Sequence, residues 1–141
     1  MIHMGIDPGV HTGVAFWHSD KRELTHTDTL DFWSTVEEMY RLVAGHLPYC
    51  IHIENPNANK PVFLKKGIGG ERSIQKIAQN VGSNKREASL LIELCKREGW
   101  NYQEHVPKRG KLDSATFRKF TGITRRMSQH ERDAAMLVYG R

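Results

Sequence analysis

The sequence has few cysteines and no long apolar run, and both shortages narrow the class of protein. Its two cysteines, Cys50 and Cys95, lie in apolar stretches and form no CxxC pair. This excludes a disulfide scaffold and a cysteine-based zinc site, and it is typical of a reducing compartment. No apolar run approaches the roughly 20 residues that a membrane span requires. Because the first residues also lack the pattern of a secretion signal, we expect a cytoplasmic protein without a membrane segment.

The chain is also short, and its apolar content is low. It has 141 residues, of which 38% are hydrophobic and 9% are aromatic. That is enough for one hydrophobic core, and the aromatic content argues against disorder. We predict a single domain that spans residues 1–141.

The net charge of +5 is unevenly distributed along the chain. Residues 1–59 contain 3 basic and 8 acidic residues, a balance of −5, whereas residues 60–126 contain 16 basic and 6 acidic residues, a balance of +10. A solvated charged face is the plain explanation of such a basic stretch. The alternative is a surface that binds a polyanion, next to a part of the chain that needs carboxylates.

Apolar periodicity predicts an α/β domain with a mixed sheet. The predicted strands are residues 2–7, 14–17, 23–29, 49–54 and 101–106, and the predicted helices lie near 34–47, 73–80, 83–98, 114–120 and 127–139. Ser34 with Glu37, and Ser128 with Glu131, have the spacing of capping boxes, and Ser83 is expected to begin the longest helix. Between them, residues 55–70 form a long loop rich in glycine, proline and lysine, of a kind that is usually functional or disordered.

Four residues could hold a divalent metal ion. Asp7 and Glu54 each end a predicted strand, opposite the apolar face of that strand. His130 and Asp133 are three residues apart, so they project from one face of a helix. If that helix packs over the strand ends, three carboxylates and one imidazole come together, and the carboxylates repel each other unless a cation compensates. Oxygen-rich ligands of this kind suit Mg²⁺ or Mn²⁺.

Taken singly, each of these residues has an ordinary structural explanation. Asp7 before Pro-Gly suits a turn, and Glu54 suits a solvated strand end. His130 and Asp133 suit an exposed pair near the beginning of a helix. The joint placement of all four at strand ends and on one helix face favours a site.

Three segments resemble the acidic motifs of RuvC-type Holliday junction resolvases, which are nucleases of the RNase H-like superfamily. They are MGIDPGVHTGVAF at 4–16, IHIEN at 51–55 and HERDAA at 130–135. The resemblance implies an RNase H-like fold, with a mixed five-stranded sheet flanked by helices. It also implies that Asp7, Glu54, His130 and Asp133 bind two Mg²⁺ ions, with Mn²⁺ also expected to support activity. The segment EHVPKRGK at 104–111 resembles the stretch that brings a lysine to the scissile phosphate, and Lys111 fits that position better than Lys108.

The implied activity is metal-dependent phosphodiester hydrolysis in four-way DNA junctions, by a homodimer that makes paired cuts. A junction has two equivalent strands, which a symmetric dimer matches, and the broad apolar face of helix 84–98 is the candidate interface. Phe63 either packs into the core or stacks at the branch point. The residues expected to contact DNA are Lys60, Phe63, Lys65, Lys66, Lys85, Arg86, Lys108 and Arg109. The protein would act at the nucleoid, or in the host cytoplasm if a phage encodes it.

Three other functions are compatible with parts of the sequence. A YqgF-type RNase H-like nuclease acting on structured RNA shares the early Asp and the late Asp-Ala motif, but Glu54 favours the resolvase. The DPGxxTG pattern after Ile6 resembles the phosphate loop of actin-like ATPases, which are far longer than this chain. A non-catalytic nucleic-acid-binding module would gain nothing from carboxylates close to phosphates.

Overall fold

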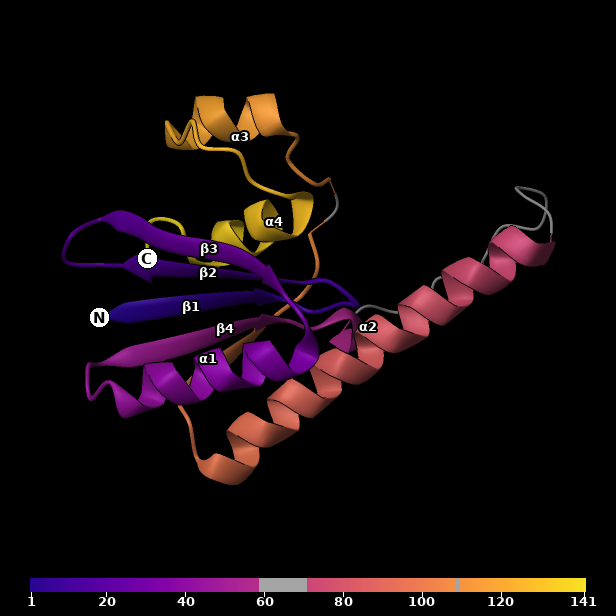
Figure 1. Cartoon of the computed structure of the whole chain (residues 1–141), viewed down its shortest axis with the longest axis horizontal. Coiled ribbons are helices and arrows are strands. Elements are labelled where there is room, and N and C mark those ends of the chain that lie inside the picture. Colours follow the sequence, from indigo (N-terminus) through magenta and orange to yellow (C-terminus); the bar gives the residue numbers. More distant parts are fainter. Residues whose placement is uncertain (59–70, 109) are drawn as a thin grey trace.

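A five-stranded sheet with helices on both faces forms the centre of the protein (Figure 1). The computed structural model describes the backbone of residues 1–58, 71–108 and 110–141, and the side chains of the same ranges except 71–81. The elements are β1 (Ile2–Asp7), β2 (Thr12–His18), β3 (Glu23–Leu30), α1 (Phe32–Ala44), β4 (Tyr49–Glu54), the 3₁₀ turn η1 (Pro56–Ala58), α2 (Glu71–Glu98), β5 (Tyr102–His105), α3 (Ser114–Thr121) and α4 (Gln129–Val138).

The strand order is β3-β2-β1-β4-β5, and the sheet is mixed as the sequence predicts. Strands β1, β2 and β3 form an antiparallel meander, whereas β4 runs parallel to β1 and β5 runs parallel to β4. In this register Ile6 of β1 lies opposite Ile53 of β4. The next residues, Asp7 and Glu54, therefore leave the sheet at the same level of the same edge.

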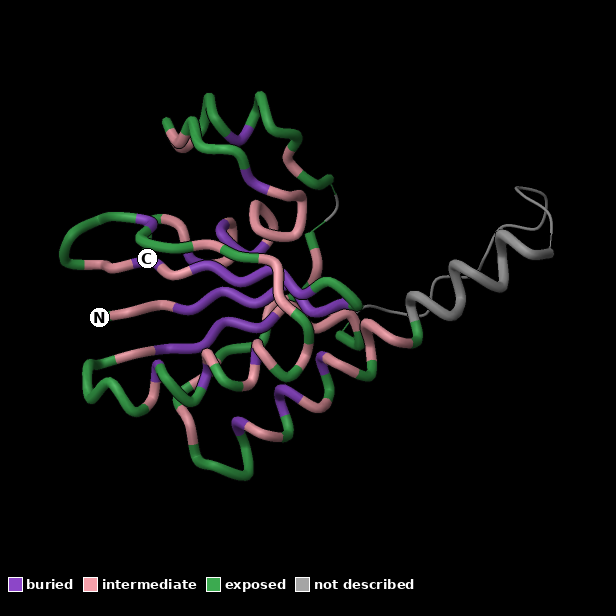
Figure 2. Tube along the Cα trace, in the orientation of Figure 1, coloured by how far each residue is buried: buried purple, intermediate pink, exposed green. Residues whose placement is uncertain are grey.

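Alternation along the strands builds a separate core on each face of the sheet (Figure 2). One core joins the sheet to α1 and α2, and it includes Met4, Ile6, Met39, Leu91 and Cys95. The other joins the sheet to α4 and α3, and it includes Ala15, Trp17, Phe117, Ala134 and Val138. Cys50 and Cys95 are both buried and unpaired, as expected for reduced core residues.

Helix α4 lies unusually close to the sheet because glycines face it. A Cβ atom on Gly5 would stand 2.2 Å from the carbonyl oxygen of Ala134, and one on Gly13 would stand 2.0 Å from that of His130. Real Cβ atoms essentially never approach backbone this closely, so any side chain at Gly5 or Gly13 would force α4 away. The alanines of α4 contribute to the same close contact, because Ala134 and Ala135 are fully buried.

Two helix boundaries differ from those predicted. Helix α1 begins at Phe32, and its N-cap is Asp31, whose carboxylate accepts a hydrogen bond from the backbone N–H of Ser34. The predicted capping box of Ser34 with Glu37 is therefore wrong, because an earlier and stronger acceptor caps the helix. Ser83 likewise does not begin a helix but lies inside the continuous α2. Residues 71–98 contain no proline, and one internal glycine costs only about 1 kcal/mol.

The apolar face of α2 packs within its own chain. Ala88, Leu91, Ile92 and Cys95 are buried against the sheet, and Leu94 packs against the same core. Much of the broad apolar stripe that suggested an interface over 84–98 is thus covered by the protein's own core. No helix in the described part of the chain is both long and apolar enough to cross a membrane.

The close contact between α4 and the sheet predicts a large loss of stability when a methyl group is added there. Gly13→Ala should lower the free energy of unfolding by about 2–3 kcal/mol, because the new Cβ atom meets helix backbone that cannot move without repacking. Urea denaturation followed by circular dichroism measures this change. The matched control is Gly82→Ala in α2, where a Cβ atom meets no described residue within 4 Å. This control should stabilise the protein by about 0.5–1 kcal/mol. Equal effects of the two substitutions would contradict the close-contact account.

Candidate functional site

Asp7 stands at the end of the central strand and is almost completely buried. Its carboxylate Oδ2 is 3.0 Å from Nδ1 of His130 in α4. Burial raises the pKa of Asp7, against the opposing effects of the His130 hydrogen bond and the charge of Lys111. The turn that follows is closed by Thr12, whose Oγ1 donates to the carbonyl of Gly9 at 2.9 Å. These contacts hold the Asp7 carboxylate in one position at the sheet edge.

Glu54 occupies the equivalent position on β4. Burial raises the pKa of Glu54 from 4.5 to about 7, and the negative charges of Asp7 and Asp133 add to the effect of burial. The charge of Lys111 acts in the opposite direction but does not offset them. At this edge of the sheet, the positive charge of Lys111 therefore does not balance the negative charges that act on Glu54.

Helix α4 is held at its N-terminus by the predicted capping box, which the structure confirms. Ser128 Oγ accepts from the backbone N–H of Glu131 at 3.1 Å, and the Glu131 carboxylate accepts from the backbone N–H of Ser128 at 3.1 Å. Glu131 Oε2 also accepts from Thr27 Oγ1 of β3 at 2.8 Å. This anchorage directs His130 and Asp133 toward the edge where β1 and β4 end.

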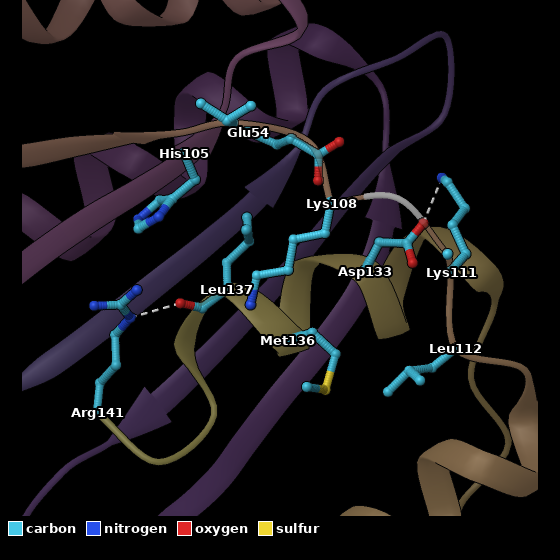
Figure 3. Close-up of a pocket in the computed structure, with 11 residues that line it drawn as sticks. Glu54, His105, Lys108, Lys111, Leu112, Asp133, Met136, Leu137 and Arg141 are labelled. Carbon is cyan, nitrogen blue, oxygen red and sulfur yellow. Dashed lines mark hydrogen bonds and ion pairs between the residues drawn. The ribbon is translucent and has the colours of Figure 1, made fainter. Parts of the chain in front are cut away.

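Asp133 is held by two donors. Lys111 Nζ donates to its Oδ2 at 2.5 Å, and Gln129 Nε2 donates to its Oδ1 at 2.8 Å. Partial burial lowers the pKa of Lys111, but the hydrogen bond to Asp133 and the charges of Asp7, Asp133 and Glu54 outweigh it and raise the pKa overall. Glu54, Lys111 and Asp133 line one pocket, shown in Figure 3. Asp7 and His130 contact each other beside this pocket, and the charges of Asp7, Glu54 and Asp133 all act on Lys111.

The donor set at this edge fits a divalent cation of the Mg²⁺ or Mn²⁺ type. It consists of three carboxylates and one imidazole, which is an oxygen-rich set. The ammonium group of Lys111 lies among the carboxylates, where positive charge is needed. Within the described residues, no three Asp, Glu, His or Cys side chains are drawn together closely enough to hold one ion.

The residues predicted to contact DNA are only partly within the described structure. Lys85 and Arg86 lie on α2, and Lys108 lines the same pocket as Glu54. Arg86 and Lys108 are exposed, and Lys85 is half-buried. The remaining predicted residues, Lys60, Phe63, Lys65, Lys66 and Arg109, lie outside the described residues.

A further basic surface was not singled out from the sequence. Arg118 and Lys119 are exposed at the end of α3, and Arg125 and Arg126 are exposed in the segment after it. In the part of the chain that the structure describes, none of these four forms an ion pair with an acidic residue. The signal was the density of arginine and lysine over 118–126, which contributes to the basic balance of the middle segment.

Glu87 of α2 was also missed. It lies beside the turn after Asp7, and its Oε2 is buried and has no hydrogen-bond partner among the described residues. Gly9 in the same turn packs against Asn84. Helix α2 thus supports the Asp7 turn from the side opposite α4.

The comparisons with known proteins assign no family: no family model matches the chain, and no curated protein matches it. What can be said of function therefore depends on the residues and on their geometry.

The raised pKa of Glu54 predicts a pH-dependent stability. A carboxyl whose pKa is higher in the folded protein stabilises the fold fully below its unfolded pKa of 4.5, and loses that contribution as the pH rises through about 7. In EDTA, Glu54→Gln should therefore match the wild type near pH 4 and exceed its free energy of unfolding by on the order of 1–3 kcal/mol at pH 8. Urea denaturation at several pH values measures the difference. If the free energies of unfolding of the wild type and of Glu54→Gln differ by the same amount at every pH, folding does not raise the pKa of Glu54.

Proposed function

We propose that the protein is a divalent-metal-dependent endonuclease that resolves four-way DNA junctions. The observation that carries this proposal is the meeting of Asp7, Glu54, His130 and Asp133 at one sheet edge, with Lys111 among them. Such a cluster is unfavourable unless cations enter it, and it adjoins surfaces rich in lysine and arginine. That combination suits the hydrolysis of a phosphodiester.

Asp7, Glu54, His130 and Asp133 would hold the metal ions, and the carboxylates would carry most of the ligand charge. When bound, divalent cations supply charge stabilisation for the phosphate and lower the pKa of an attacking water. Burial and the charges of Asp7 and Asp133 raise the pKa of Glu54, and a divalent cation beside it would favour the ionised carboxylate against both effects.

His130 and Lys111 have separate roles toward the substrate. An ionised Asp7 can only accept a hydrogen bond, so Nδ1 of His130 carries the proton in that contact. This leaves Nε2 of His130 as a ligand or as an acceptor for a proton of the attacking water. Lys111 would exchange its contact with Asp133 for one with the phosphate, and neutralise charge that develops there.

The basic residues would position the DNA without reading its sequence, because they would contact phosphates. Lys85 and Arg86 belong to α2, which packs on one face of the sheet. Arg118 and Lys119 belong to α3, which lies beyond α4 on the other face (Figure 1), and Arg125 and Arg126 follow α3 in the sequence. Branched DNA has arms that leave in several directions, and basic surfaces on two sides of the acidic edge suit such a shape.

One set of cleavage assays tests both the substrate preference and the role of Asp7 as a metal ligand. We expect the wild type to cut a labelled four-way junction in Mg²⁺, and to cut a Y-fork or a linear duplex more slowly. Asp7→Asn should reduce cleavage at least about 100-fold while junction binding persists, because a central ligand to the cations is lost.

The matched control is Asp28→Asn, an exposed aspartate of β3. This variant should cut the junction at the wild-type rate. Undiminished cleavage by Asp7→Asn would remove the metal-site proposal. Preferential cleavage of structured RNA in the same panel would keep the chemistry but replace the substrate.

Paired cuts in a junction require two active sites, and each chain supplies one. We therefore expect a homodimer, with the exposed side of α2 near 84–98 as its interface. Sedimentation equilibrium at micromolar concentration should give twice the chain mass of 16.2 kDa. A protein that sediments at 16.2 kDa alone, and that adds only one chain mass to the junction when it binds, would contradict paired cleavage by a dimer.

A further inference from the structure

The pocket at the acidic edge continues into a second, basic part. It has a volume of about 280 Å³, and Glu54, Lys111 and Asp133 line one end of it. His105 and Arg141 line the other end, and Lys108 extends from beside Glu54 toward Leu137. The apolar side chains of Met136 and Leu137 lie between the two parts, and Leu112 lies below Lys111 (Figure 3). None of the roles proposed above for the acidic edge uses His105 or Arg141.

Arg141 is held in place by contacts that leave the end of its guanidinium open. Its Nε donates to the carbonyl oxygen of Leu137 at 2.6 Å, and its own carbonyl accepts from Trp17 Nε1 at 2.8 Å. Within the described residues, no hydrogen bond is formed by its two terminal nitrogens, and no Asp or Glu pairs with it. A fixed guanidinium with free N–H groups is suited to bind a phosphate with two parallel hydrogen bonds.

His105 is oriented by a row of histidines across three adjacent strands. His52 Nδ1 lies 2.9 Å from His105 Nε2, and His3 Nδ1 lies 2.9 Å from His52 Nε2. Burial lowers the pKa of His52 to about 3, so this ring is neutral at physiological pH. The row fixes the His105 ring and leaves its Nδ1 without a hydrogen bond inside the described part of the protein.

The charges in this part of the pocket are uncompensated. Burial lowers the pKa of His105, and the positive charges of Arg141 and Lys108 lower it further, so both cations lie close enough to influence that ring. Among the described residues, neither cation has an acidic partner. An anion that entered here would relieve this repulsion, as a cation would at the acidic end.

We propose that Lys108, Arg141 and His105 form a second phosphate subsite. This subsite would hold one backbone phosphate of a DNA strand while the next phosphate of the same strand occupies the acidic end of the pocket. The choice of DNA as the ligand rests on the proposed function. Asp133 and Leu137, whose carbonyl holds Arg141, are separated by four residues of α4, a rise of about 6 Å. The two parts of the pocket are thus offset along α4 by about one helical turn, which suits two phosphates of one extended strand. The apolar side chains between them would face the intervening sugar or base.

Binding measured without cleavage tests the subsite. Wild-type protein, Arg141→Gln and Lys108→Gln are titrated with a four-way DNA junction in EDTA at several salt concentrations. Each variant should bind about three- to tenfold more weakly, with a dependence of affinity on salt that is shallower by about one counterion. Arg41→Gln is the matched control, because Arg41 is exposed on α1, on the opposite face of the sheet. This control should change neither quantity. Arg141→Lys should keep the salt dependence of the wild type but lose part of the affinity, because an ammonium group keeps the charge but cannot make two parallel hydrogen bonds. Thermal denaturation of each variant shows that the fold is intact.

A scan with single neutral methylphosphonates near the branch point identifies the phosphate that is held. One position should weaken binding of the wild type but have little further effect on Arg141→Gln. If both variants bind with wild-type affinity and salt dependence, or if every neutral position weakens wild type and Arg141→Gln equally, the subsite is absent. If the chain binds DNA in this pattern yet cleaves no substrate in Mg²⁺ or Mn²⁺, the nuclease proposal fails and the subsite stands.

Discussion

Helix α4 reaches the sheet because Gly5 and Gly13 have no side chains, and the candidate site depends on that contact. With Cβ atoms 2.2 and 2.0 Å from helix carbonyls, any other residue would push α4 outward. His130 could then no longer meet Asp7, and Asp133 would leave the edge where Glu54 ends β4. The glycines set the height of α4 above the sheet. The hydrogen bonds of Ser128 and Glu131 to Thr29 and Thr27 of β3 set its position along the sheet.

Acidic and basic side chains lie next to each other in the pocket of the candidate site. The first 59 residues have a balance of −5 and residues 60–126 a balance of +10, and the fold brings parts of both to one pocket. Burial and the charges of Asp7 and Asp133 raise the pKa of Glu54, and the charge of Lys111 opposes only part of this shift. Beyond Lys111, Lys108 and Arg141 form the basic part of the same pocket. A phosphodiester accompanied by divalent cations would satisfy both groups at once.

Much of this arrangement follows from short-range patterns in the sequence. Alternation placed Asp7 and Glu54 at strand ends, the i, i+3 spacing placed His130 with Asp133, and the Ser128 capping box is as predicted. Local patterns misled where two signals competed, since Asp31 caps α1 in place of Ser34 and Ser83 does not interrupt α2. The contact of Lys111 with Asp133 and the position of Arg141 join residues that no local periodicity relates. The predictions for Lys60, Phe63, Lys65, Lys66 and Arg109 stay predictions.

The central claim is that the edge formed by Asp7, Glu54, His130 and Asp133 takes up divalent cations. It is tested most directly by anomalous diffraction from crystals of the protein soaked in MnCl₂ near pH 8. We expect manganese peaks within bonding distance of these carboxylates, with the Lys111 ammonium displaced from Asp133. Crystals in which Lys111 stays on Asp133 and no manganese peak lies at this edge would contradict the account.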